Sequence, residues 1–127
     1  MAALATTLAN ALLNATLRNT AYVQPTTVYV ALFTVTPTAA GGGTEATGGS
    51  YARVAVTFGA AAAGQVTNSA DALFPAATVG WGTIVAAAIF DSLNGGTLLY
   101  FGPCGPIAIN TGDQPKFVAG TLAVSLA

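Results

Sequence analysis

The sequence predicts a mainly β protein: an antiparallel β-sandwich, jelly-roll-like, with one N-terminal α-helix. Only the first 20 residues have an amphipathic helical period, so no second long helix is available for parallel crossovers. Short β-branched and aromatic runs follow, with turn signals about every eight to twelve residues, a spacing typical of sandwiches. Without a repeat or a linker, residues 1–127 are expected to form a single domain, with the helix in residues 1–20 and the sandwich in residues 22–127.

The N-terminal helix is expected across Ala2–Leu17, because leucines and alanines recur at three- and four-residue spacing. Its apolar face carries Leu4, Leu8 and Leu12, and the opposite face offers only Asn, Thr and Ala. Two interpretations stay open: the helix packs between its own sheet and a neighbouring molecule, or it only covers its own core. A signal peptide is not expected, because the segment lacks a positively charged start and polar residues interrupt it.

The next segment, Thr27–Thr34, is apolar on both faces, which predicts a strand buried from both sides. Thr36–Ser50 contains Pro37 and two glycine clusters, and we expect a long mobile loop without structure of its own. Tyr51–Phe58 alternates apolar and polar residues, which predicts a half-buried antiparallel strand.

The clearest hairpin joins Thr83–Phe90 to Thr97–Phe101, because Asn94-Gly95 between them favours the positive φ of a tight turn. A Gly- and Pro-rich turn is expected at Gly102–Pro106. Shorter strands are expected at Gln65–Thr67, Ala72–Phe74, Ile107–Asn110, Lys116–Val118 and Gly120–Leu126.

Charge is scarce, with three Lys or Arg, four Asp or Glu and no His in 127 residues. An average domain of this length would carry about 32 charges. Three scattered cations do not provide the basic surface that binds phosphates, so we expect no nucleic acid partner. No apolar run approaches the roughly 18 residues of a membrane span, so we expect no membrane partner. So few charges favour burial in subunit contacts, where charged residues are depleted.

Catalytic chemistry is not expected. Without His and with the single cysteine Cys104, the sequence lacks the usual zinc and nucleophile constellations. The glycine run Gly41–Thr44 lacks the lysine of a phosphate-binding loop. Asp71, Asp91 and Asp113 lie at turns, where Asp accepts hydrogen bonds from the backbone. We therefore expect no enzyme, no cofactor, no metal and no small-molecule substrate.

Two further features have alternative interpretations. Glu45 and Arg53 are expected to form an exposed ion pair across the base of the loop, worth about 0–1 kcal/mol. Trp81 is expected to be a packing anchor. The alternative is that Trp81, Tyr51 and Tyr100 form an exposed aromatic platform for a glycan.

An ordered series of short motifs extends through nearly the whole chain, from Tyr22 to Leu126. The motifs are Tyr29-Val30-Ala31-Leu32-Phe33-Thr34, Pro37, Gly41-Gly42-Gly43-Thr44-Glu45, Gly48-Gly49-Ser50-Tyr51-Ala52-Arg53, Asn68-Ser69, Phe74-Pro75, Trp81-Gly82-Thr83, Phe90-Asp91, Gly95-Gly96, Gly112-Asp113 and Ala119-Gly120. This series resembles a family of small tailed-phage virion proteins, variously labelled tail fibre, minor tail or capsid cement proteins. The resemblance implies a structural virion protein and brings no catalytic residue with it.

Among virion roles, we expect a capsid decoration or cement protein, made in the host bacterial cytoplasm and located on the capsid surface of the virion. Its partners would be the major capsid protein and copies of itself, as a homotrimer. A short chain without heptads or fibrous repeats is a poor fibre shaft. The alternatives are a tail or tail-fibre component such as an adaptor, and a glycan-binding module.

The contact surface is expected on the N-terminal helix and on the loop Thr38–Ser50 with the residues that follow it. The interface residues predicted there are Leu4, Leu8, Leu12, Thr44, Glu45, Tyr51 and Arg53.

Overall fold

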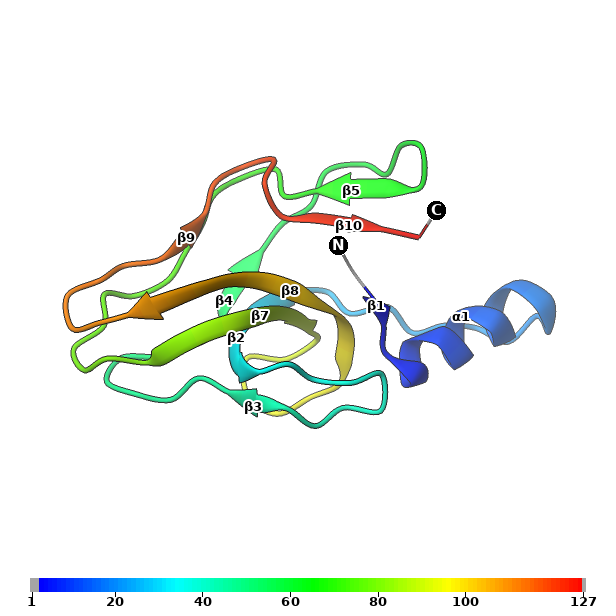
Figure 1. Cartoon of the computed structure of the whole chain (residues 1–127). Coiled ribbons are helices and arrows are strands. Elements are labelled where there is room, and N and C mark those ends of the chain that lie inside the picture. The colour runs from blue at the N-terminus through cyan, green and yellow to red at the C-terminus, as the bar shows by residue number, and fades with distance from the viewer. Residues whose placement is uncertain (1–2, 127) are drawn as a thin grey trace.

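A computed structural model describes residues 3–126 as one main antiparallel sheet, two small β-ribbons and one helix (Figure 1). The main sheet has the order β1-β8-β7-β2-β3, and β4 also pairs with β2. Its strands are β1 (Ala3–Leu4), β2 (Val28–Val35), β3 (Thr44–Glu45), β4 (Val54–Val56), β7 (Gly82–Phe90) and β8 (Leu98–Ile109). The ribbons pair β5 (Gln65–Thr67) with β10 (Ala123–Ser125), and β6 (Ala72–Leu73) with β9 (Lys116–Phe117).

The two ribbons lie over one face of the main sheet, and the larger apolar cluster joins them to it (Figure 1). Val30 and Ile84 of the main sheet belong to that cluster, as do Phe74, beyond β6, and Leu122, before β10. The prediction of a mainly β chain with antiparallel sheets and one helix is confirmed. The jelly-roll arrangement stays a prediction, because the second layer consists of two separate ribbons rather than one sheet.

The central strand β2 is buried on both faces, as its sequence predicts. Val30 and Leu32 belong to the cluster under the ribbons, whereas Ala31 and Phe33 belong to a second cluster on the opposite face. This second cluster also includes Ala86 and Ala88 of β7, and Phe90 and Phe101 pack partly against it.

The hairpin β7–β8 is confirmed, but β8 is longer than expected. The turn predicted at Gly102–Pro106 is wrong, because β8 continues through this segment as far as Ile109. The pairing register shifts there: Ile84 lies opposite Ile107, and Ala86 lies opposite Pro103. The extra residues of β8 form a bulge at the edge of the sheet. Proline has no N–H to donate to the neighbouring strand, and it is tolerated in a bulge because the bulged residues are unpaired.

The helix α1 (Thr6–Leu17) begins later than predicted. The expected helix is present as far as Leu17, but its predicted start is wrong: Ala3 and Leu4 form β1 instead and pair with the edge of β8. Ala2 lies outside the described residues. From there α1 extends away from the sheets, so that its last turns project from one end of the molecule (Figure 1). Among residues 3–126, no helix is long and apolar enough to cross a membrane.

The segment predicted as a loop without structure is partly ordered. It contains β3, which pairs with β2, and both Pro37 and Ala46 are buried. By contrast, the strand predicted at Tyr51–Phe58 is shorter, since only Val54–Val56 pairs with β2. Tyr51 lies outside β4, and its hydroxyl accepts a hydrogen bond from the Leu32 backbone N–H of β2.

Candidate functional site

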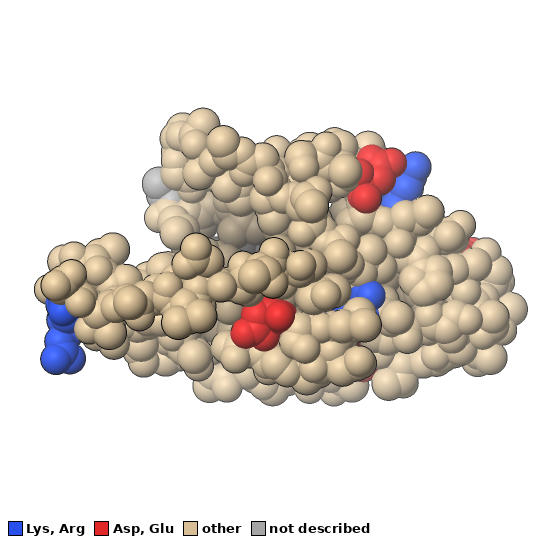
Figure 2. Space-filling model, turned by 180° about the vertical axis from the view of Figure 1, so that it is seen from behind, with Lys and Arg blue, Asp and Glu red and all other residues tan. Residues whose placement is uncertain are grey.

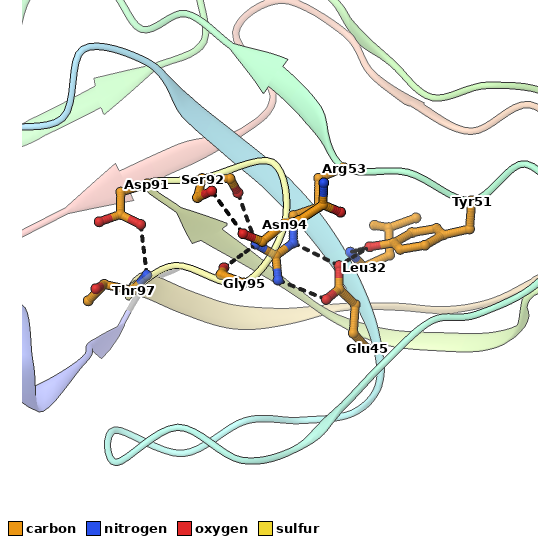
Figure 3. A network of polar contacts seen from close by, with 9 residues as sticks. All are labelled: Leu32, Glu45, Tyr51, Arg53, Asp91, Ser92, Asn94, Gly95 and Thr97. Carbon is orange, nitrogen blue, oxygen red and sulfur yellow. Dashed lines mark hydrogen bonds and ion pairs between the residues drawn. The ribbon is translucent and has the colours of Figure 1, made fainter.

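Three of the predicted interface residues meet in one polar cluster: Glu45 from β3, and Tyr51 and Arg53 from the segment before β4 (Figure 3). Arg53 donates from Nε to Glu45 Oε2 and from Nη2 to Glu45 Oε1, each at 2.9 Å. The Tyr51 hydroxyl donates to Glu45 Oε2 at 2.6 Å. Both oxygens of the Glu45 carboxylate are therefore occupied by donors of the same chain.

Arg53 also binds the turn between β7 and β8. Its Nη1 donates to the carbonyl oxygens of Ser92 at 2.9 Å and Gly95 at 2.7 Å, as Figure 3 shows. Its guanidinium carbon lies 3.8 Å from the centre of the Phe90 ring, a cation–π geometry. The predicted ion pair is confirmed, but the expectation that it is exposed is wrong for Arg53, whose side chain is only 8% exposed.

The electrostatics of the cluster favour a charged carboxylate. Burial acts to raise the pKa of Glu45, but the hydrogen bonds from Arg53 and Tyr51 and the charge of Arg53 outweigh it and hold the pKa below its ordinary value. Burial, followed by the hydrogen bond to Glu45, raises the pKa of the Tyr51 hydroxyl, which therefore stays protonated and keeps donating. The hydrogen bonds of this cluster therefore link β3 to β2 and to the turn of the β7–β8 hairpin.

Trp81 is the packing anchor that the sequence predicts. Its side chain is 2% exposed, its Nε1 donates to the Gly49 carbonyl oxygen at 2.9 Å, and the Tyr51 ring meets it edge-on at 5.2 Å between ring centres. The alternative of an exposed aromatic platform formed with Tyr100 is wrong, because a buried indole cannot stack on a glycan.

The three predicted turn aspartates accept backbone hydrogen bonds, as expected. Asp91 binds the N–H of Thr97, and Asp113 binds that of Asn110. The third bond is not local, because Asp71 binds the N–H of a residue 48 positions further along the chain, Ala119. Within residues 3–126, no three His, Cys, Asp or Glu side chains gather into a group that could hold a metal ion.

The predicted helix residues lie apart from the polar cluster. Leu8 is buried in the protein's own core, and Leu4 and Leu12 pack partly against it, which supports the interpretation that this face covers its own sheet. Thr44 is exposed at the sheet edge. Whether any of these residues contacts another protein stays a prediction.

Two apolar features of the surface were not predicted from the sequence. One is the outer face of α1, where Leu13 is 56% and Leu17 is 78% exposed. Their four-residue spacing was a readable signal, since it places both on one helix face. The other is a cleft of about 510 Å³ at the β8 bulge, which has no sequence signal because the register shift creates it. Cys104 lines this cleft, and burial raises the pKa of its thiol.

The chain matches a known protein family but no individual curated protein. A protein-family model described as "Podophage GP4 fiber I protein gp80" matches residues 3–125, nearly the whole chain. The match agrees with the resemblance to tailed-phage virion proteins, although it does not single out capsid cement proteins. The chain therefore belongs to the family described as podophage GP4 fiber I protein gp80.

Proposed function

We propose that this chain is a structural subunit of a phage fibre and that it acts by binding other proteins. The observation that carries the proposal is the family match over residues 3–125, because the family's description names a fibre protein. The role as a globular fibre or adaptor subunit corresponds to the tail-fibre alternative of the sequence analysis.

The surface supports an associative role. Charged side chains are few on the face that Figure 2 shows, and most of that face is uncharged. Several charges are already engaged within the chain: Glu45 binds Arg53, and Asp71 lies 3.7 Å from Lys116. An accessible surface of 6709 Å² with so few free charges is better suited to subunit contacts than to solvent.

Electron microscopy of virions labelled with gold-conjugated antibodies against the chain tests the proposal. We expect label on the fibres or at their attachment points. Particles treated with antibodies absorbed beforehand on the purified protein serve as the control. Label confined to the capsid shell, or no label above the control, would overturn a fibre location.

A second candidate is a capsid decoration protein that stabilises the lattice of the major capsid protein, with copies of itself as a homotrimer. It is favoured by the compact two-layer body, in which the longest described strand has only 12 residues and no extended shaft occurs within residues 3–126. Quantitative mass spectrometry of purified virions separates the candidates. A decoration protein approaches the copy number of the major capsid protein, whereas a fibre subunit is present in far fewer copies.

A further inference from the structure

The turn between β7 and β8 contains the one Asn-Gly pair of the sequence, Asn94-Gly95. Asparagine is a thermolabile residue, because its side-chain amide can be attacked by the backbone nitrogen of the following residue. Attack is easiest when that residue is glycine, since no β-carbon shields the nitrogen. The other asparagines are followed by Ala, Ser or Thr. Residue order alone therefore distinguishes Asn94 from the rest.

The fold leaves both reacting groups of this pair accessible. Asn94 and Gly95 are exposed, and within residues 3–126 no hydrogen bond occupies the Asn94 side-chain amide or the Gly95 N–H. A Cβ added at Gly95 would have no atom within 4 Å, so the space beside this residue is open. By contrast, the Asn68 amide is buried and binds four backbone groups. The structure protects Asn68 from attack and leaves Asn94 free to react.

Two contacts of the turn favour loss of the Gly95 N–H proton, the step that makes this nitrogen a nucleophile. Ser92 Oγ donates to the Asn94 carbonyl oxygen at 2.9 Å. That oxygen belongs to the same peptide unit as the Gly95 nitrogen, so it shares the negative charge that forms when the proton leaves. A hydrogen bond to a charged form favours that form. The Arg53 guanidinium, which donates to the Gly95 carbonyl oxygen at 2.7 Å, adds a positive charge near this peptide unit (Figure 3).

We propose that Asn94 is a site of spontaneous deamidation and that the Ser92 hydroxyl promotes the reaction. The Gly95 nitrogen forms a bond to Asn94 Cγ, the bond from Cγ to Nδ2 breaks, and Nδ2 leaves as ammonia with the proton that Gly95 lost. The product is a cyclic imide, which water opens. Attack of water at Cγ gives aspartate, and attack at the main-chain carbonyl carbon gives isoaspartate. Water is the co-reactant, and the reaction needs no oxidant or enzyme.

Both products change the surroundings of Arg53. A carboxylate at position 94 adds a negative charge to a turn at which Arg53 and Asp91 now supply one charge of each sign. Isoaspartate also lengthens the main chain by one atom, directly before the Gly95 carbonyl group that Arg53 binds. The isoaspartate form therefore weakens the contact between Arg53 and the turn, whereas the aspartate form adds only the charge.

Incubation of the intact protein in mildly alkaline heavy-oxygen water tests the proposal. Each deamidation event then incorporates one heavy oxygen atom, which separates it from any event before the incubation. Trypsin cuts after Lys and Arg, so residues 54–116 form one peptide that contains Asn68, Asn94 and Asn110. Fragmentation by electron transfer locates the label in this peptide and distinguishes isoaspartate from aspartate. We expect the label at residue 94, in both forms.

Asn110 is the matched control within the same peptide, because it is also exposed but precedes Thr111. It should react about tenfold more slowly than Asn94, since a β-branched residue hinders the attacking nitrogen. Asn94→Gln should remove the label from the turn, because the longer side chain must close a larger ring. Equal labelling of Asn94 and Asn110, or no label at residue 94, would overturn the proposal.

Ser92→Ala tests whether the folded turn promotes the reaction. Its labelling rate should be about threefold lower than that of the unmodified sequence in the folded protein, and the same in urea, where the hydrogen bond is lost. Equal rates in the folded protein would overturn the role of Ser92.

Urea unfolding tests the consequence for Arg53. Incubated protein, which contains isoaspartate, should unfold at a lower urea concentration than Asn94→Asp, which carries the charge without the longer main chain. Equal urea midpoints would contradict the weakened contact between Arg53 and the turn.

Discussion

Arg53 holds Glu45 by both carboxylate oxygens, with two nitrogen-to-oxygen distances of 2.9 Å. The same guanidinium binds two carbonyl oxygens of the β7–β8 turn and covers the Phe90 ring. One side chain therefore joins the ordered loop, the central sheet and the longest hairpin. Since Arg53 is almost completely buried, its charge depends on these partners for compensation.

Glu45→Ala should lower the free energy of unfolding by about 3 kcal/mol, because it leaves the buried charge of Arg53 without its carboxylate. Urea unfolding followed by circular dichroism measures this. In the double variant Glu45→Ala/Arg53→Met, the loss should be smaller than the sum of the losses of Glu45→Ala and Arg53→Met, since both charges are removed together. Additive losses would show that the pair is not coupled.

Lys116→Ala is the control for ion pairing in general. Lys116 and Asp71 form the other ion pair found within residues 3–126, with 3.7 Å between Lys116 Nζ and Asp71 Oδ2. Both side chains are about half exposed. Breaking it should change the free energy of unfolding by about 0–1 kcal/mol. A loss as large as that of Glu45→Ala would mean that burial does not explain the difference between the pairs.

Stability should fall in acid because of Glu45. Its pKa is lower in the folded chain than the roughly 4.3 of an unfolded glutamate, so its contribution is fully present above about pH 4.3 and is lost as the pH falls through the folded-state pKa. Urea midpoints measured between about pH 2 and 6 should show this loss. Glu45→Gln should flatten the profile, and an unchanged profile would assign the acid sensitivity to other carboxylates.

Asn68 should be among the least replaceable polar residues. Its buried amide donates to the carbonyl oxygens of Ala70, Phe117 and Val118 and accepts from the Leu122 N–H, so it joins segments about 50 residues apart. Asn68→Ala should cost about 3 kcal/mol or more, because these backbone groups lose their partner inside the core.

Asn94→Ala, at an exposed position of the β7–β8 turn, is the matched control for Asn68 and should change thermal stability little. Differential scanning fluorimetry compares the two variants directly. Equal effects would contradict the role of Asn68 as a buried connector.

Close packing around Trp81 predicts a large effect at Gly48. An added Cβ there would lie 2.6 Å from Trp81 Cδ1, and φ is +152°. Gly48→Ala should therefore cost about 2–3 kcal/mol and increase quenching of the single tryptophan by acrylamide. Gly42→Ala separates sterics from backbone strain, because φ is +78° but no atom lies within 4 Å of the added Cβ; we expect about 1 kcal/mol and unchanged quenching.

The sequence predicted those features that depend on local pattern. The two-faced burial of Thr27–Thr34, the hairpin at Asn94-Gly95 and the buried Trp81 follow from residue type and spacing. The Glu45–Arg53 pair was also predicted. Its burial was not, because the Phe90 ring and the turn carbonyls that enclose Arg53 come from a part of the chain about 40 residues away.

The missed features depend on tertiary pairing. Gly102–Pro106 has the composition of a turn, and only the neighbouring strand β7 makes it a bulge within β8. Likewise, Ala3–Leu4 fits the helical period, but the free edge of β8 pairs with it as a strand. The cleft beside Cys104 results from the same bulge, so a reading of local pattern could not locate it.

A cryo-electron microscopy map of the intact virion at side-chain resolution tests the central claim most directly. We expect copies of this fold in the fibre, in far fewer copies than the major capsid protein. Density for the fold only on the capsid shell would contradict the fibre role.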